Sequence, residues 1–146
     1  MIRQGIYKPQ NPHKYKGNFD NIVFRSSWER RVMVYLDTNP SILEWNSEEI
    51  VIPYMSPIDN RIHRYFVDFY VKAKTKDNLI KEMLWEVKPE SQTVQPKQQK
   101  RITKRYINEV TTWGVNEAKW KAANGFCKDR GWAFMLITEK NLGIKS

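Results

Sequence analysis

The sequence predicts a single α/β domain over residues 1–146, in which a mixed β-sheet is flanked by helices. Two runs, 64–71 and 83–88, are rich in Val, Phe, Tyr and Trp, the composition of a pleated, half-buried strand. Segments with a helical period precede and follow these runs, and an apolar run closes the chain. The order of helix, strands, helices and strand therefore indicates a mixed sheet with helical cover, and a chain of 146 residues is long enough to enclose a hydrophobic core.

The first 21 residues are predicted to form an irregular N-terminal arm. They contain Pro9, Pro12 and Gly17 and follow neither a helical nor a strand period. The arm also mixes basic and aromatic side chains, a combination that is able to follow a nucleic-acid backbone. These side chains are Lys8, His13, Lys14, Tyr15 and Lys16. A packed surface arm without a ligand explains the same residues equally well.

A first helix is expected from Ser26 to about residue 37. Ser26 is followed three positions later by Glu29, which is the spacing of a capping box, and Asn39-Pro40 ends the helix. An apolar stripe at helical spacing should face the core. It consists of Trp28, Val32, Tyr35 and Leu36.

The two aromatic runs are predicted to pair as a β-hairpin. The segment between 64–71 and 83–88 is polar and turn-prone around Asp77-Asn78. A turn centred there pairs residues whose numbers sum to about 154, by the antiparallel geometry of a hairpin. This register puts Asp68 opposite Glu86.

Three further strands are expected from short extended patterns. Residues 42–45 and 50–54 precede the hairpin. The last strand, 132–138, shows no alternation of apolar and polar residues. Because such a strand is normally covered on both faces, we expect it to lie inside the sheet.

Two helices, Lys97–Thr112 and Asn116–Lys128, are predicted after a loop at 89–96. Gly114 marks the break between them, and Gly131 is placed to cap the second helix.

The charge of the chain favours a polyanionic partner. With 25 Lys and Arg against 16 Asp and Glu, the formal net charge is +9. Composition alone does not distinguish nucleic acid from an anionic membrane surface. Beyond Pro96, five cations fall on one face of the predicted helix, and no Glu four residues away pairs with them, so phosphate contact is favoured over a solvated face. These cations are Lys97, Lys100, Arg101, Lys104 and Arg105.

The sequence further predicts a soluble, intracellular protein with no membrane partner. It contains no apolar stretch long enough to cross a bilayer and no apolar signal-peptide core. Cys127 is the only cysteine, so an internal disulfide is excluded. We interpret Cys127 as a small buried helix residue rather than a nucleophile.

The two central strands carry charged groups where an ordinary strand is apolar. Glu86 and Lys88 are two residues apart and therefore share a face. Asp68 would join them through the hairpin register. Two such carboxylates repel each other unless a cation lies between them, and hard oxygen ligands suit Mg²⁺ or Mn²⁺. The alternative is a salt bridge on an exposed strand face.

Glu29 has two interpretations. It is the acidic member of the capping box, but it also lies beside Val32 and Leu36 on the helical wheel, at the edge of the buried stripe. From that position it would add a third carboxylate to the same site. The two roles are compatible.

Together these residues resemble the PD-(D/E)xK nuclease pattern, with Val67 at the position of its proline. Residues 24–29, the Asp68 strand, residues 85–88 and the tail 123–142 are similar to the TnsA-type transposon endonucleases. With the arm residues 7–12 and Lys14-Tyr15-x-Gly17 added, the whole chain resembles the head-completion nucleases of large tailed phages.

The resemblance implies a restriction-endonuclease-like fold and a metal-dependent DNA nuclease. It implies that Asp68 and Glu86 bind Mg²⁺ or Mn²⁺ together with the backbone carbonyl of Val87. Lys88 would position or activate the attacking water and offset the charge of the phosphate. Glu29 would complete the metal shell or orient the water.

The resemblance also implies partners and a setting. Duplex DNA is the expected substrate, in the cytoplasm of an infected bacterium and before head-tail joining. Phage head, portal or neck proteins and a second copy of the chain are further candidate partners, and association with the virion is left open. Two alternatives remain, namely a non-catalytic DNA-binding protein of the head and neck, and a transposon or repair endonuclease of the TnsA type.

Overall fold

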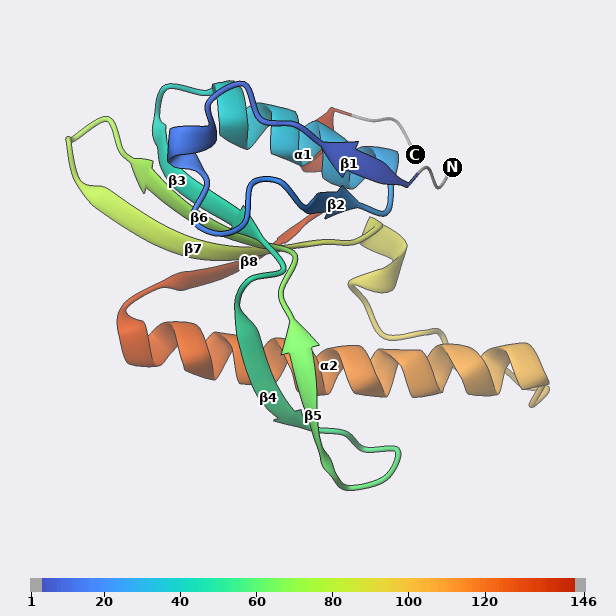
Figure 1. The fold of residues 1–146 in the computed structure, drawn as a ribbon. Coiled ribbons are helices and arrows are strands. Elements are labelled where there is room, and N and C mark those ends of the chain that lie inside the picture. The colour runs from blue at the N-terminus through green and yellow to red at the C-terminus, as the bar shows by residue number, and fades with distance from the viewer. Residues whose placement is uncertain (1–3, 144–146) are drawn as a thin grey trace.

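The structure, a computed structural model, describes residues 4–143 and confirms the α/β class. Its central sheet has four strands in the order β3-β6-β7-β8, shown in Figure 1. All neighbours are antiparallel except β7 and β8, which run parallel, so the sheet is mixed. The strands are β3 (Ile42–Ser47), β6 (Phe69–Lys74), β7 (Ile80–Val87) and β8 (Ala133–Ile137).

The sheet separates two hydrophobic clusters, each covered by one helix. Helix α1 (Ser27–Thr38) lies above the sheet and α2 (Lys104–Arg130) below it in Figure 1. On the α1 side, Leu36 packs among Trp45 and other residues of the first cluster. On the α2 side, Trp120, Ala123 and Cys127 pack against Leu84 and the β4–β5 ribbon. Cys127 is buried and free, as the sequence predicted.

The hairpin of β6 and β7 has the predicted register. Phe69 pairs with Trp85 and Lys74 with Ile80, and the numbers in each pair sum to 154. The chain reverses between Thr75 and Leu79, where Asn78 adopts a left-handed backbone with φ 61°. Asn tolerates this conformation better than most residues, which explains why a short polar segment fixes the register.

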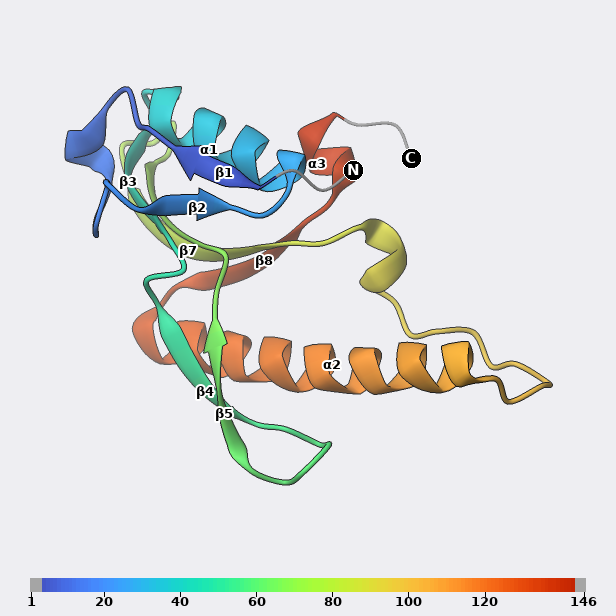
Figure 2. The same ribbon diagram turned by 45° about the vertical axis from the view of Figure 1, so that its right-hand side comes forward.

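The expected single strand 64–71 is wrong, because the chain changes sheets at Val67-Asp68. Residues before the break form β5 (Ile62–Phe66), which pairs with β4 (Val51–Met55) in a separate two-stranded ribbon. Residues after it form β6. The ribbon extends away from the sheet and crosses α2 in Figures 1 and 2. At the break, the Val67 N–H donates to the Ile50 carbonyl at 3.2 Å, and the Asp68 carbonyl accepts from Glu48 N–H at 3.2 Å.

The N-terminal arm is ordered, which corrects the prediction of an irregular segment. Strand β1 (Gly5–Tyr7) pairs with β2 (Ile22–Phe24), and a short 3-10 helix, η1, spans Pro12–Lys14 between them. Tyr15 is buried. The interpretation as a packed arm therefore describes this region better than a free basic strand. The first three residues of the arm predicted over 1–21 lie outside the described residues.

The Lys14 ammonium is committed to the fold rather than to a ligand. It donates to the backbone carbonyls of Asp37 at 3.0 Å and Asn39 at 2.9 Å, at the end of α1. Lys8, His13 and Lys16, which were also considered for contact with a nucleic-acid backbone, are exposed.

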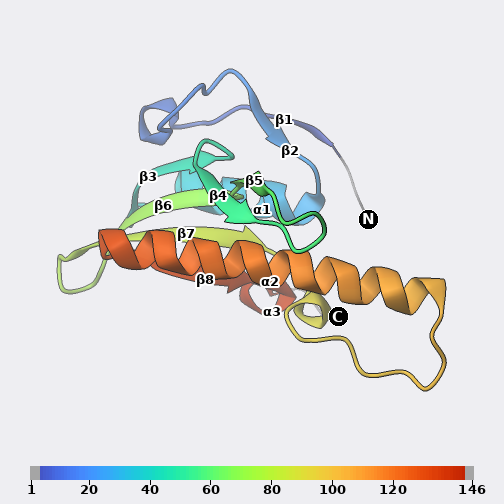
Figure 3. The same cartoon turned by 90° about the horizontal axis from the view of Figure 1, so that it is seen from below.

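The second half of the chain contains one long helix instead of the two that were predicted. Helix α2 begins at Lys104, where the Thr103 side chain accepts from the Tyr106 N–H at 3.1 Å, and it continues unbroken through Gly114. Its packing against the ribbon and the sheet spans the glycine and outweighs the local preference for a break. Figure 3 shows α2 running along the sheet, with its N-terminal half extending past the sheet's end.

Residues 97–103, expected to be helical, belong instead to a long loop that begins after β7 and includes the 3-10 helix η2 (Glu90–Gln92). Pro96 therefore does not open a helix. Gly131 does cap α2 as predicted, since its left-handed backbone, with φ 71°, lets its N–H reach the carbonyls of Cys127 and Lys128.

Strand β8 is at the edge of the sheet, which corrects its predicted central position. Its lack of alternation has another cause, because helices cover both of its faces. Phe134 and Leu136 pack into the α2 cluster, while Ala133 and Ile137 pack into the α1 cluster. The last helix, α3 (Glu139–Leu142), follows directly. Residues 4–143 contain no helix that is both long and apolar enough to cross a membrane.

Candidate active site

The predicted carboxylates Asp68 and Glu86 meet where the chain leaves the ribbon and where β7 ends. Asp68 Oδ2 accepts a hydrogen bond of 2.8 Å from the backbone N–H of Val87. Glu86 is only 5% exposed, and Asp68 is partly buried. The break before β6 thus turns the Asp68 side chain toward the end of β7.

The electrostatic environment of the pair strongly disfavours two negative charges. Burial is the main reason that the pKa of Asp68 is raised well above its usual range, and the charges of Glu86 and Glu29 add to it. The Val87 N–H and the charge of Lys88 oppose this rise without cancelling it. The pKa of Glu86 is also raised by burial, again with Lys88 opposing. Without a cation, the site therefore favours a protonated carboxyl.

Two buried polar atoms at this site have no hydrogen-bond partner among the described residues. They are Glu86 Oε1 and the Tyr65 hydroxyl, which are near enough for Tyr65 to lower the pKa of Glu86 but form no hydrogen bond of good geometry. Burial raises the pKa of Tyr65, and the charge of Glu86 raises it further, so the phenol stays neutral. A buried carboxylate oxygen without a partner is costly, and such a group in a folded protein calls for a ligand or a function. Glu86 Oε1 therefore has room for a further partner.

Of the two roles considered for Glu29, the structure shows the one at the cap of α1. Its N–H donates to Ser26 Oγ at 3.1 Å, which caps α1, and its own Oε1 accepts from the Arg25 N–H at 3.3 Å. Burial raises the pKa of Glu29, and its charge reaches Asp68. Glu29 is thus held at the cap of α1, close enough for its charge to act on Asp68.

The donor atoms fit a divalent cation at Asp68 and Glu86. The described residues contain no group of three or more His, Cys, Asp or Glu side chains arranged to hold a metal, so Glu29 does not join the pair in such a cluster. A backbone oxygen can complete the set. Lys88 N–H points to β8 and donates to Ile137 at 2.9 Å, so the polar groups of Val87 face the other way, where its N–H meets Asp68. The Val87 carbonyl leaves the strand on that same side.

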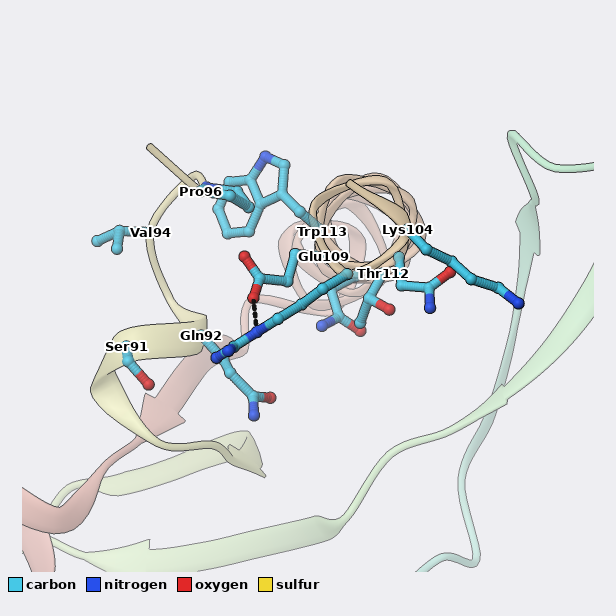
Figure 4. A pocket seen from close by; sticks show the side chains of 11 residues that line it. Ser91, Gln92, Val94, Pro96, Lys104, Glu109, Thr112 and Trp113 are labelled. Carbon is cyan, nitrogen blue, oxygen red and sulfur yellow. Dashed lines mark hydrogen bonds and ion pairs between the residues drawn. The ribbon is translucent and has the colours of Figure 1, made fainter. Parts of the chain in front are cut away.

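The five predicted DNA-contacting cations do not share one helical face. Lys97, Lys100 and Arg101 belong to the loop, and only Lys104 and Arg105 lie on α2. Arg105 is paired through its Nε with Glu109 at 3.2 Å, which corrects the prediction that no acidic partner is present. In Figure 4 Glu109 lies on the side of α2 that faces the loop, whereas Lys104 extends in another direction.

A groove of about 860 Å³ lies between this loop and the first half of α2. Residues from both sides line it, among them Gln92, Pro96 and Trp113, as Figure 4 shows. None of the three central residues Asp68, Glu86 and Lys88 lines the groove. The groove is therefore separate from the candidate active site, which is defined by the carboxylate pair.

Two residues near the pair received no role from the sequence. Tyr65 shares the strand alternation of β5, and only its unpaired hydroxyl sets it apart. Arg25 forms an ion pair with Glu48, 23 positions away, through a contact that no local pattern indicates. Arg25 lies in the stretch 24–29 that resembles the TnsA-type endonucleases, but that resemblance gave it no role.

A mixed α/β fold with two carboxylates and a lysine at the ends of adjoining strands defines the nuclease class of site. A family model described as TnsA-like endonuclease N terminal matches residues 39–139, which include Asp68, Glu86 and Lys88. The chain is also 38% identical, over 146 residues, to a protein of Enterobacteria phage T4 named head completion nuclease. That match covers 97% of this chain and 95% of the relative. The chain therefore belongs to the TnsA-like endonuclease family.

Proposed function

We propose that this chain is a divalent-metal-dependent DNA nuclease that hydrolyses phosphodiester bonds. The observation that carries the proposal is the Asp68–Glu86 pair, with raised pKa values and an open Glu86 oxygen. Such a pair is stabilised by a hard cation such as Mg²⁺ or Mn²⁺. Family membership supports the nuclease part of the proposal, while the requirement for a metal rests on the chemistry of the pair.

In this proposal Asp68, Glu86 and the Val87 carbonyl hold the cation. The cation, when bound, would neutralise phosphate charge and acidify water, the two effects that phosphodiester hydrolysis needs. Lys88 contributes positive charge on the same face as Glu86, where the transition state gains negative charge. Glu29, held by the α1 cap, accepts a hydrogen bond from the attacking water and orients it.

We further propose that the nuclease acts in phage head completion, before head-tail joining. This part rests on the name of the phage T4 relative and on coverage of nearly all of both chains. The setting would be the cytoplasm of the infected bacterium, with duplex DNA as substrate and head, portal or neck proteins as further partners.

The experiment compares cleavage of linear and circular duplex DNA by wild type, Asp68→Asn and Glu86→Gln, with Mg²⁺, with Mn²⁺ and with EDTA. Both substitutions keep the shape of the side chain and remove its charge. Asp59→Asn, in the exposed turn of the ribbon where Asp59 pairs with His63 at 2.8 Å, is the matched control. Cleavage that needs the metal and is lost in the two site variants but not in the control is expected.

The circular substrate separates internal cutting from trimming of ends. If wild type binds DNA but cuts neither substrate with any metal, the catalytic proposal is overturned and a DNA-binding structural role takes its place. If Asp68→Asn cuts as wild type does, the assignment of the site is wrong.

A further inference from the structure

A second pocket, of about 510 Å³, opens beside the carboxylate pair. It lies between residues 18–25, which include β2, and residues 47–49 at the end of β3. Its lining includes the polar residues Asn18, Arg25, Glu48 and Glu49 and the ring of Phe66. Phe66 precedes Asp68 by two positions, so the pocket reaches the edge of the candidate active site.

Arg25 is the one cation that lines this pocket in the described part of the chain. Its Nη1 donates to Glu48 Oε1, and 57% of the Arg25 side chain and 30% of the Glu48 side chain are exposed. An ion pair this exposed contributes little stability, because water and salt screen it. The guanidinium is therefore available to a competing anion at small cost.

Backbone contacts fix both members of the pair next to the carboxylates. Arg25 N–H donates to Glu29 Oε1 at 3.3 Å, and Glu48 N–H donates to the Asp68 carbonyl at 3.2 Å. The charges of Glu29 and Asp68 help to raise the pKa of the Arg25 guanidinium, after the larger effect of Glu48. Arg25 is thus a positive charge at the border of a strongly negative site.

Glu48 differs from the other carboxylate of the pocket in two respects. Glu49 is held in place, because its Oε2 accepts from the Tyr15 hydroxyl at 3.1 Å and from Asn18 N–H at 3.3 Å. Glu48 has Arg25 as its ion-pair partner. Its backbone is left-handed, with φ 56°, a conformation that costs free energy for a residue other than glycine. The chain retains this strain at the point where Glu48 faces Arg25.

We propose that this pocket binds a DNA backbone phosphate next to the scissile bond, with Arg25 as its ligand, and that Glu48 occupies Arg25 until DNA displaces it. A guanidinium donates a fork of N–H groups that matches two phosphate oxygens, and the exposed pair with Glu48 is too weak to prevent a phosphate from taking that place. Phe66 supplies an apolar wall beside the sugar. The inference rests on the proposed nuclease function and adds a substrate contact to it.

The test measures binding of a duplex oligonucleotide in EDTA, where no cleavage takes place. Arg25→Ala should weaken binding on the order of tenfold, the loss of one charge-assisted contact. It should also reduce the slope of log affinity against log salt concentration by about 0.9, the value for one phosphate. The DNA affinity of Arg25→Lys should lie between those of wild type and Arg25→Ala. Glu48→Gln should tighten binding, because it frees the guanidinium.

The double variant Arg25→Ala/Glu48→Gln decides between competition and general repulsion. If Glu48 acts by occupying Arg25, Glu48→Gln gives no gain once Arg25 is absent. If Glu48 only repels DNA, the gain persists in the double variant and the proposal is overturned.

Glu44→Gln is the matched control. Its pair with Lys16, at 3.6 Å, has side-chain exposures of 57% and 28%, nearly those of Arg25 and Glu48. Glu44→Gln should leave the affinity for DNA unchanged. Thermal unfolding of every variant shows whether each is folded.

The outcomes separate this inference from the nuclease proposal. A wild-type protein that neither binds nor cuts DNA would refute the nuclease function itself. A wild type that binds and cuts, with Arg25→Ala indistinguishable from Glu44→Gln, would overturn the phosphate pocket alone.

Discussion

The Tyr7 hydroxyl donates a hydrogen bond of 2.6 Å to Asp37 Oδ2, and this contact ties the N-terminal arm to the end of helix α1. The Asp37 carboxylate is completely buried and also accepts from the backbone N–H groups of Gln10 at 2.7 Å and Asn11 at 3.0 Å. Burial, reinforced by Asp37, raises the pKa of Tyr7, which keeps the phenol a donor. One carboxylate thus fixes an arm whose Tyr7 and Tyr15 also pack into the α1 cluster.

Asp37→Ala should destabilise the protein by about 3 kcal/mol or more, because it leaves three donors without their acceptor. Asp37→Asn, which keeps the shape and one acceptor oxygen, should cost less. Urea unfolding gives the free energies. Limited proteolysis should cut the arm first in Asp37→Ala, and the exposed Asp20→Ala provides the control. Unchanged stability in Asp37→Ala would mean that the arm is not held by this carboxylate.

Gly114 and Gly131 should respond in opposite directions to substitution by alanine. Gly114 lies inside α2, and an added Cβ would meet only Pro57 Cγ, at an ordinary 3.8 Å. Gly114→Ala should therefore stabilise the helix by about 0.5–1 kcal/mol. At Gly131, where φ is 71°, alanine should cost about 1 kcal/mol. Thermal unfolding measures both changes. A destabilised Gly114→Ala would mean that the neighbouring Pro57 does not accommodate the added methyl group.

The register of β6 and β7 was predictable because it depends on a short local turn. Once Asn78 and its neighbours reverse the chain, the pairing of Phe69 with Trp85 follows by counting. The same register brought Asp68 to the level of Glu86, so the heart of the candidate site could be predicted from sequence.

The break at Val67-Asp68 could not be predicted, because residues on both sides have the same strand composition. Its cause is tertiary, since Val67 bonds to Ile50 in the ribbon while β6 joins the sheet. The pair of Arg25 and Glu48 is hidden for the same reason. The continuity of α2 across Gly114 depends on packing against the sheet, which local propensity does not reveal.

Lys104 and Arg105 should contribute unequally to DNA binding. Glu109 already compensates Arg105, whereas Lys104 extends away from that pair (Figure 4). Lys104→Ala should lower the salt slope of binding by about 0.9, and Arg105→Ala should lower it by less. Titrations at several salt concentrations measure both slopes. Equal losses would show that the pair with Glu109 opens on DNA, and no loss in either would leave both residues as a solvated surface.

Removing the charge of Asp68 or Glu86 should stabilise the metal-free protein at neutral pH. Both carboxyls have pKa values above their ordinary ones, so between the unfolded pKa, about 4, and the raised folded pKa, the folded state binds more protons. Stability of wild type should accordingly decrease as pH rises through that window. Asp68→Asn and Glu86→Gln should raise the unfolding temperature by a few degrees at neutral pH.

The gain should disappear near and below the unfolded pKa, because there both states of wild type are protonated. Thermal unfolding in EDTA across this pH range tests the sign. Mg²⁺ or Mn²⁺ should then reverse the order at neutral pH, since a cation that binds the charged pair stabilises wild type but has lost a ligand in each variant. If the stability of wild type in EDTA does not depend on pH over this range, folding does not raise the pKa values of the two carboxyls. A metal-induced shift of equal size in all three proteins would place the cation elsewhere.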